Sequence, residues 1–149
     1  MLTAFKRRRV RAFTLLEIMI VVMIIGMLAA ITGTSVIQRL KSAKIKIAKT
    51  YVKGAGAQAL EMYFTDNGFY PTTDQGIAAL MHKPTSSPVP KSWTEPYLKE
   101  IPQDPWGEIY HYNCPGDKSG NDFDLWSAGP DRVSGTSDDI GNWPDEEQE

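Results

Sequence analysis

The longest apolar stretch of the chain runs from Phe13 to Ile31. Only Thr14 and Glu17 interrupt its nineteen residues with polar side chains. As a helix rising ~1.5 Å per residue, this run is about 28 Å long, close to the thickness of the hydrocarbon core of a bilayer. The pattern predicts a transmembrane helix that has one carboxylate near its polar edge.

An amphipathic pattern follows the apolar run. Apolar residues recur at steps of three and four, the period of one helix face. They are Val36, Leu40, Ala43, Ile47, Tyr51, Ala55 and Ala59. Asp66-Asn67-Gly68 is typical of a helix end, so we expect a helix from about Phe13 to Asp66. Gly33 costs ~1 kcal/mol in a helix interior and marks a place for local melting.

The remaining residues predict a small globular region. "YPTTDQGIAALM" (residues 70–81) indicates a turn and a short helix, with Thr72 as its cap and Gln75 as the capping-box partner. Alternation over residues 109–113 and 123–127 predicts two short strands. Two strands alone are barely stable, so we expect the long helix to cover them. The fold class is therefore α+β, with a long N-terminal helix packed on a small antiparallel sheet.

Charge divides the chain in two. Residues 1–60 have a net charge of +10, and residues 61–149 have a net charge of −12. The basic residues flank the apolar run, which favours a membrane surface over nucleic acid as the partner. The dense cluster from Lys6 to Arg11 adjoins the run and predicts a cytoplasmic N-terminus. The bare count opposes this orientation, because six further cations follow the run, spread over residues 39–53.

Several classes of site are missing from the sequence. The single cysteine, Cys114, excludes an intramolecular disulfide. His82 and His111 lack the neighbouring ligands of a zinc site. No G-x-S-x-G motif, P-loop or Cys/His pair is present, so we expect a protein that is not an enzyme.

Glu17 needs an explanation that a membrane anchor alone does not give. A carboxylate inside a membrane helix costs about 2.5–3.5 kcal/mol, less near the interface, unless it has a partner. Arg9 and Arg11 precede it, so snorkelling toward these cations is one interpretation. A secretory signal would not explain Glu17 either. The apolar run is also longer than a signal core, and Leu28-Ala29-Ala30 has a leucine where signal cleavage requires a small residue.

The segment "RAFTLLEIMIVVMIIGMLAA" (residues 11–30) resembles the class III signal of type IV pilins and pseudopilins. The resemblance implies cleavage between Ala12 and Phe13 by a prepilin peptidase, and N-methylation of Phe13. It also implies that Glu17 acts in assembly, by neutralising the amine of a neighbouring subunit's first residue. Two charges that are costly singly in lipid become tolerable as a pair. Ala12 departs from the glycine that is usual before the cut.

The last informative stretch is "SAGPDRVSGTSDDIGNW", residues 127–143, which we call the acidic loop. Asp131, Asp138 and Asp139 fall within nine residues among glycines and serines. Oxygen ligands on a turning backbone suit Ca²⁺, although the spacing is not that of an EF-hand. On composition alone, a solvated acidic loop is the better interpretation of this stretch.

The segments "DPWGEIYHYNCPG" (residues 104–116) and "FDLWSAGPDRVSGTSDDIGNW" (residues 123–143) are similar to the major pseudopilins of type II secretion. That resemblance implies one Ca²⁺ in the acidic loop and a pilin fold. It places side-chain ligands at Asp131, Asp138 and Asp139. It places backbone carbonyl ligands at Ala128, Val133 and Thr136.

The resemblance implies a division into a leader (1–12), a transmembrane and assembly segment (13–35), an amphipathic segment (36–66) and a periplasmic globular region (67–149). The implied function is the major structural subunit of a pseudopilus, polymerising into a periplasmic fibre that promotes export of folded proteins across the outer membrane. The implied location is the bacterial inner membrane, spanned once. The implied partners are copies of itself, minor pseudopilins, the prepilin peptidase and the inner-membrane assembly platform. Two rivals remain: a type IV or competence pilus subunit, and a membrane-anchored calcium-binding module that does not assemble.

Overall fold

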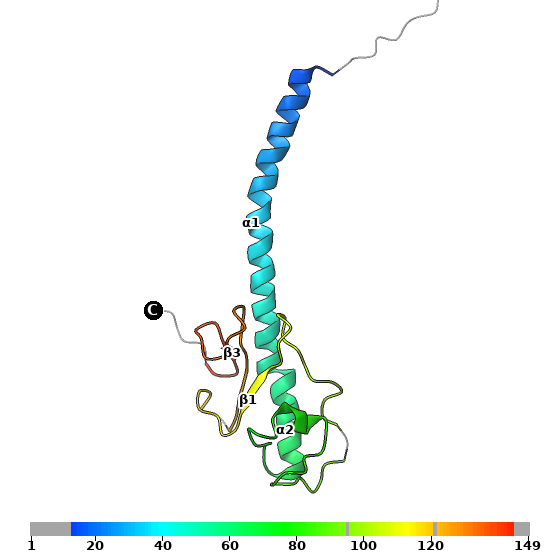
Figure 1. Ribbon diagram of the computed structural model, residues 1–149, viewed down its shortest axis with the longest axis vertical. Coiled ribbons are helices and arrows are strands. Elements are labelled where there is room, and N and C mark those ends of the chain that lie inside the picture. Colours follow the sequence, from blue (N-terminus) through cyan, green and yellow to red (C-terminus); the bar gives the residue numbers. More distant parts are fainter. Residues whose placement is uncertain (1–12, 95, 121, 145–149) are drawn as a thin grey trace, which may run out of the picture. The chain divides into compact units, whose positions relative to one another are not determined.

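The computed structural model describes residues 13–94, 96–120 and 122–144, except for the side chains of residues 30–35 (Figure 1). The chain forms two compact units, residues 1–40 and 41–149. The elements in chain order are α1 (Leu15–Lys53), α2 (Ala55–Asn67), the 3₁₀ helix η1 (Ile77–Leu80), β1 (His111–Asn113), β2 (Asp124–Ser127) and β3 (Ile140–Gly141). This content confirms the predicted α+β class.

The first unit contains the start of α1. Thr14 caps the helix, because its Oγ1 accepts a hydrogen bond from the Glu17 backbone N–H at 3.2 Å. The helix continues without interruption through Gly33. Within the described residues, no helix combines the length and the apolar character that crossing a membrane requires. The transmembrane span over Phe13 to Ile31 therefore stays a prediction.

The helical segment is interrupted at Gly54 instead. Gly54 has φ −119° and ψ −104°, outside the helical region, and separates α1 from α2. Its N–H donates to the carbonyl of Tyr51, a shorter-range bond than the α-helical one. The predicted end of the helix is confirmed, because α2 ends at Asn67. Gly68 follows with φ 80°, and its N–H donates a hydrogen bond to the Phe64 carbonyl at 2.7 Å.

The buried face of the helices matches the predicted one only in part: Ala59 is buried in the core and Tyr51 packs against it, but other members of the predicted face are exposed. Ile47 is 59% exposed, whereas Ala48 and Val52 are fully buried. Ala55 is also exposed. Apolar residues stand next to one another at 47–48 and 51–52, so the sequence contains two neighbouring stripes of the same period. Packing against the sheet selects the second stripe.

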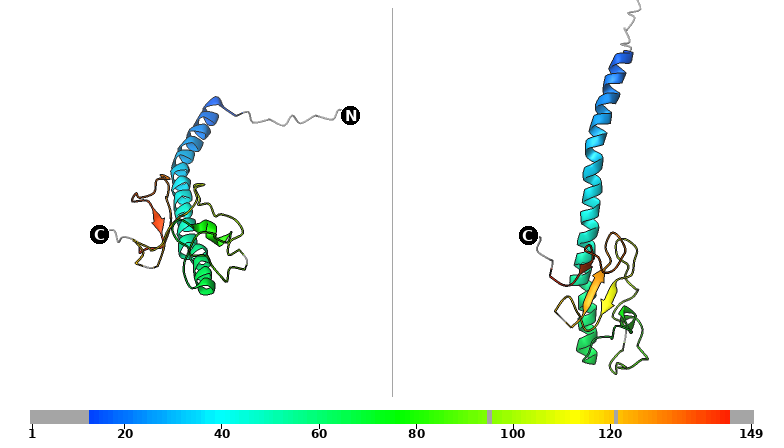
Figure 2. Two further views of the ribbon diagram at one scale, coloured as in Figure 1. Left: turned by 60° about the horizontal axis from the view of Figure 1, so that its bottom comes forward. Right: turned by 60° about the vertical axis from the view of Figure 1, so that its left-hand side comes forward.

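The sheet has three antiparallel strands in the order β1-β2-β3. Tyr112 pairs with Leu125, and Trp126 pairs with Gly141. Figure 2 shows β1 and β2 side by side in its right-hand view. The two predicted strands are confirmed, each shorter than expected. The sequence did not predict β3, which lies inside the acidic loop and has only two residues.

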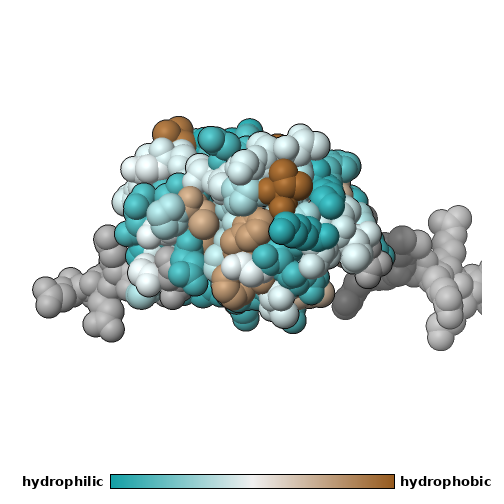
Figure 3. Space-filling model, turned by 90° about the horizontal axis from the view of Figure 1, so that it is seen from below, coloured by the Kyte–Doolittle hydropathy of each residue, from teal (hydrophilic) through white to brown (hydrophobic). Residues whose placement is uncertain are grey.

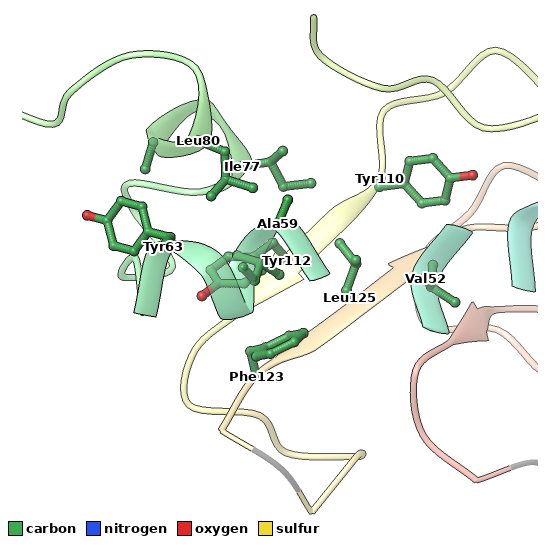
Figure 4. Packing of buried hydrophobic residues seen from close by; sticks show 11 residues of the cluster. Val52, Ala59, Tyr63, Ile77, Leu80, Tyr110, Tyr112, Phe123 and Leu125 are labelled. Carbon is green, nitrogen blue, oxygen red and sulfur yellow. The ribbon is translucent and has the colours of Figure 1, made fainter. Parts of the chain in front are cut away.

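The core belongs to the second unit and joins the helices to the sheet. Figure 4 shows side chains from α2, η1 and the strands pointing toward one another. The central members are Val52, Ala59, Leu60, Tyr63, Ile77, Leu80, Tyr110, Tyr112, Phe123 and Leu125. Tyr110 and Tyr112 are buried and Trp106 and Trp126 are half-buried, so these aromatic side chains form part of the core and its rim. Each large side chain that is fully buried contributes about 1.5–3 kcal/mol.

The capping-box residues bond to each other but do not cap a helix. The Thr72 N–H donates to Gln75 Oε1 at 3.1 Å, and the Gln75 N–H donates to Thr72 Oγ1 at 3.3 Å. Gly76 follows with φ 57°, and η1 begins only after it. The pair therefore closes a turn, and the predicted short helix is a single 3₁₀ turn. Gln75 Nε2 also donates to the carbonyls of Ser86 and Pro88, which fixes the proline-rich loop, residues 83–93, to this turn.

Candidate functional site

The first candidate site is the start of α1. Glu17 lies in the first helical turn, where its negative charge faces the positive end of the helix dipole. Its side chain is exposed, and Phe13 is 73% exposed. Ala12, the other residue of the predicted cleavage site, lies outside the described residues. The cleavage, the methylation and the role of Glu17 therefore stay predictions.

An apolar surface surrounds this site. Every described side chain from Phe13 to Ala29 is exposed, and the large apolar ones among them are 46–80% exposed. Soluble monomers rarely expose an apolar patch of this extent, and such a patch marks a membrane or protein contact. The first unit thus presents a surface that needs a partner outside the chain.

The second candidate site is the acidic loop. The loop turns back on itself, so that the Asp131 N–H donates to Asp138 Oδ2 at 3.1 Å. Asp131 Oδ1 accepts the N–H of Val133 at 2.8 Å, and Asp139 Oδ2 accepts the N–H of Gly135 at 2.9 Å. The structure therefore brings Asp131 and Asp138 together, with Asp139 bonded into the same loop.

Close backbone contact holds the two ends of this loop together. Gly129 has φ 71°, and a Cβ at this position would lie 2.2 Å from the Asp138 carbonyl oxygen. Only glycine fits here. Ala128 beside it is buried, and the Ser127 hydroxyl accepts the Gly129 N–H at 3.1 Å. The predicted carbonyl ligand at position 128 therefore lies on a fixed part of the backbone.

The predicted calcium ligands fit a cation in part. The Asp139 side chain is only 3% exposed, and its Oδ1 has no hydrogen-bond partner among the described residues. A buried carboxylate oxygen without a partner is costly, and a hard cation would satisfy it. The Thr136 hydroxyl on Asp138 holds the pKa of that carboxyl below its usual value, so it stays ionised.

Other features of the loop fall short of a complete metal site. Among the described residues, no group of three or more His, Cys, Asp and Glu side chains is arranged to hold a metal ion. The carbonyls of Val133 and Thr136 accept bonds within the loop, from the Thr136 hydroxyl and from the Asp139 N–H. A calcium site here therefore depends on backbone oxygens as well as carboxylates, and the ligand set stays a prediction.

Sequence reasoning missed two buried carboxylates that shape this region. Asp104 Oδ1 accepts the N–H groups of Trp106 and Glu108, each at 2.9 Å, and its Oδ2 accepts the Ser127 hydroxyl. Asp104 thus links the "DPWG" turn to the end of β2. The signal was present, because an aspartate two residues before a turn amide is typical of an Asx-turn.

Asp124 is the second buried carboxylate. Its oxygens accept the N–H groups of Asp117, Lys118 and Ser119 at 2.7–2.8 Å, which shapes the turn between β1 and β2. Burial alone would raise the pKa of Asp124, but the bonds from Lys118 and Ser119 outweigh it and lower the pKa below the usual value. No local sequence pattern relates Asp124 to the turn before it.

Comparison with known proteins decides the family. The family model described as "Type II secretion system (T2SS), protein G" matches residues 35–143. A second model, "Prokaryotic N-terminal methylation motif", matches residues 7–33.

The chain belongs to the type II secretion system protein G family.

Individual relatives agree with the family model. A type II secretion system core protein G from Pseudomonas aeruginosa is 49% identical over 142 residues, spanning 93% of this chain and 98% of the relative. The core protein G of Vibrio cholerae is 45% identical, over 93% of this chain and 94% of the relative. The crystal structure of the major pseudopilin from enterohaemorrhagic Escherichia coli matches with a TM-score of 0.65 and 40% identity, covering 71% of this chain and 87% of that one.

Membership of the protein G family confirms the prediction of a major pseudopilin and its α+β fold. It favours a subunit of the secretion system over a type IV or competence pilus subunit. The methylation motif spans Phe13 and Glu17, the two described residues of the first candidate site. The protein G match extends over the whole acidic loop, the second candidate site.

Proposed function

We propose that copies of this chain polymerise into a periplasmic fibre that promotes export of folded proteins across the outer membrane. The observation that carries this proposal is that one chain contains both the methylation motif at residues 7–33 and the protein G region at residues 35–143. The role is structural rather than catalytic. Its partners are other copies of the chain, minor pseudopilins, the prepilin peptidase and the inner-membrane assembly platform.

The chain spans the bacterial inner membrane once in this proposal. The apolar run from Phe13 to Ile31 is long enough for the hydrocarbon core, and the cations from Lys6 to Arg11 hold its start in the cytoplasm. The globular region is then periplasmic. The exposed apolar side chains of the first unit support this location, since lipid is a partner that matches them.

Assembly requires a partner for Glu17. Cleavage between Ala12 and Phe13 leaves a new N-terminal amine on Phe13, four residues before the Glu17 carboxylate. This amine keeps its positive charge after N-methylation. In an apolar fibre core, each Glu17 pairs with the Phe13 amine of a neighbouring copy, so that neither charge stays alone. A subunit in the wrong register would leave one charge unpaired, so the pair also sets the register.

Replacing Glu17 with leucine tests assembly separately from insertion. We expect Glu17→Leu to insert in the membrane as the wild type does, because it removes a charge from an apolar run. Fibres on electron micrographs and the export of secreted proteins are lost. Met19→Leu, a change of similar size at a neighbouring exposed position, leaves both unchanged. Normal fibres from Glu17→Leu would overturn the role of Glu17 in assembly. A wild-type chain that forms no fibres would instead favour the membrane-anchored module that does not assemble.

The acidic loop binds one Ca²⁺ in this proposal. Asp131, Asp138 and Asp139 supply side-chain oxygens, and Ala128, Val133 and Thr136 supply carbonyls. The buried Asp139 Oδ1, which has no hydrogen-bond partner in the part of the chain that the structure describes, and the close contact at Gly129 support a cation at this place. The bound cation neutralises carboxylates that otherwise repel one another and joins the two ends of the loop.

A further inference from the structure

Lys118 connects the turn between β1 and β2 to the acidic loop. Its Nζ lies 3.6 Å from Asp139 Oδ2 and 4.7 Å from the centroid of the Trp143 ring. Both distances are within the range of attraction between a cation and a carboxylate or an aromatic face. One ammonium therefore contacts two residues at the far end of the loop.

The backbone at Lys118 is held by a buried group. Asp124 is only 3% exposed and accepts the Lys118 N–H at 2.8 Å, together with the N–H groups of its two neighbours. The side chain leaves this turn toward a groove of about 980 Å³, which Asp138, Asp139 and Trp143 also line. The fold thus directs a cation to the groove beside the predicted calcium ligands.

The two partners of this ion pair differ in burial. The Asp139 side chain is 3% exposed, and its second oxygen has no hydrogen-bond partner among the described residues. The Lys118 side chain is 52% exposed. A charge as buried as Asp139 is costly unless it is paired, whereas a half-exposed lysine regains its hydration easily when it moves away. The pairing therefore stabilises the loop but can be released.

We propose that Lys118 is an internal counter-cation of the acidic loop, which holds Asp139 when calcium is absent and weakens calcium binding by competing for this carboxylate. The inference rests on the calcium site of the proposed function. It adds that Lys118, a residue outside the acidic loop, sets the calcium concentration at which the loop binds the ion. Removing the ammonium leaves the same oxygens with one more uncompensated negative charge, which attracts a divalent cation more strongly.

Lys118→Met tests this role because methionine keeps most of the length of the stem and removes the charge. The full-length chain in detergent is titrated with CaCl₂ by calorimetry, and its melting is followed by tryptophan fluorescence in EDTA. We expect Lys118→Met to bind calcium about three- to tenfold more tightly. In EDTA its Tm falls by about 2 °C, because the ion pair is lost.

Two further variants serve as controls. Lys91→Met makes the same charge change at an exposed position of the proline-rich loop and is expected to move neither quantity. Lys118→Gln removes the same charge but has a polar side chain. A change seen in both Lys118 variants therefore comes from the lost charge and not from a folding defect specific to methionine.

The outcomes separate the inference from the site on which it rests. Wild-type protein that binds no calcium would overturn the calcium site, and with it the competition by Lys118. Wild-type binding with unchanged or weaker binding in both Lys118 variants would overturn the role of Lys118 alone. An unchanged Tm in EDTA for both variants would show that Lys118 does not hold the metal-free loop.

Discussion

The two units of the chain differ in how far their apolar side chains are exposed. In the first unit every described side chain is exposed, although most of them are apolar. In the second unit Leu60, Tyr63 and Leu125 are almost completely buried, and the face seen in Figure 3 is mainly hydrophilic with scattered apolar residues. The second unit has a buried apolar core within the chain, whereas the described apolar side chains of the first unit are exposed.

This difference separates stability from assembly. A mutation in the second unit acts on the free energy of unfolding, because its neighbours are in the same chain. A mutation in the first unit acts on contacts that a single chain does not make. The family relationship fits this division, since one family model describes the N-terminal motif and another describes the globular region.

The largest effect should come from removing a large side chain from the core. Leu60→Ala deletes a fully buried side chain and should lower the free energy of unfolding by about 2–5 kcal/mol. The same substitution at Leu16, which is 66% exposed, should leave it unchanged within about 0.5 kcal/mol. Urea unfolding of the full-length chain in detergent, followed by tryptophan fluorescence, measures both.

The variants Leu60→Ala and Leu16→Ala together test whether the stability of the fold depends on the second unit alone. All four tryptophans lie in the second unit, so the fluorescence signal reports that unit. A stability loss for Leu16→Ala comparable to that of Leu60→Ala would mean that the first unit supports the core, and the division would be wrong.

The next effect should come from removing calcium. At a free calcium concentration about 100 times its Kd, binding adds about 2.7 kcal/mol to the folded state, so EDTA should lower the Tm of the wild type by several degrees. Asp139→Asn should lose this dependence, because a neutral amide is a weaker calcium ligand. The matched control is Asp74→Asn, at an exposed position outside the acidic loop, which should keep the full shift. An EDTA-independent wild-type Tm would reject a structural calcium.

The sequence predicted elements whose cause is local. The end of α2 at Gly68 follows from a glycine with positive φ, and the Thr72–Gln75 pair follows from the spacing of two side chains. The apolar run and Glu17 were visible because their pattern does not depend on contacts elsewhere in the chain. Family membership then confirmed the fold and the function that the motifs implied.

Features that depend on contacts between distant segments were missed. β3 has only Ile140 and Gly141, too few residues for alternation, and forms because β2 offers a free edge. The Asn142 side chain extends this pairing by accepting the Leu125 N–H at 3.0 Å. The helix is interrupted at Gly54 and not at Gly33. No single-residue propensity distinguishes these two glycines.

The smallest of the three effects should come from Asp124, which acts within the second unit through backbone bonds. Asp124→Asn replaces a charged acceptor of three N–H groups by a neutral one and should cost about 1–2 kcal/mol at neutral pH. Because its pKa is lowered in the folded state, the carboxylate stabilises the fold fully above the unfolded value of about 3.9. This stabilisation is lost as the pH falls through the lower, folded value. The difference in unfolding free energy between wild type and variant should therefore be constant from about pH 5 to 7 and shrink below about pH 4. A difference that stays constant down to pH 3 in urea unfolding would mean that Asp124 stabilises the turn by its shape and not by its charge.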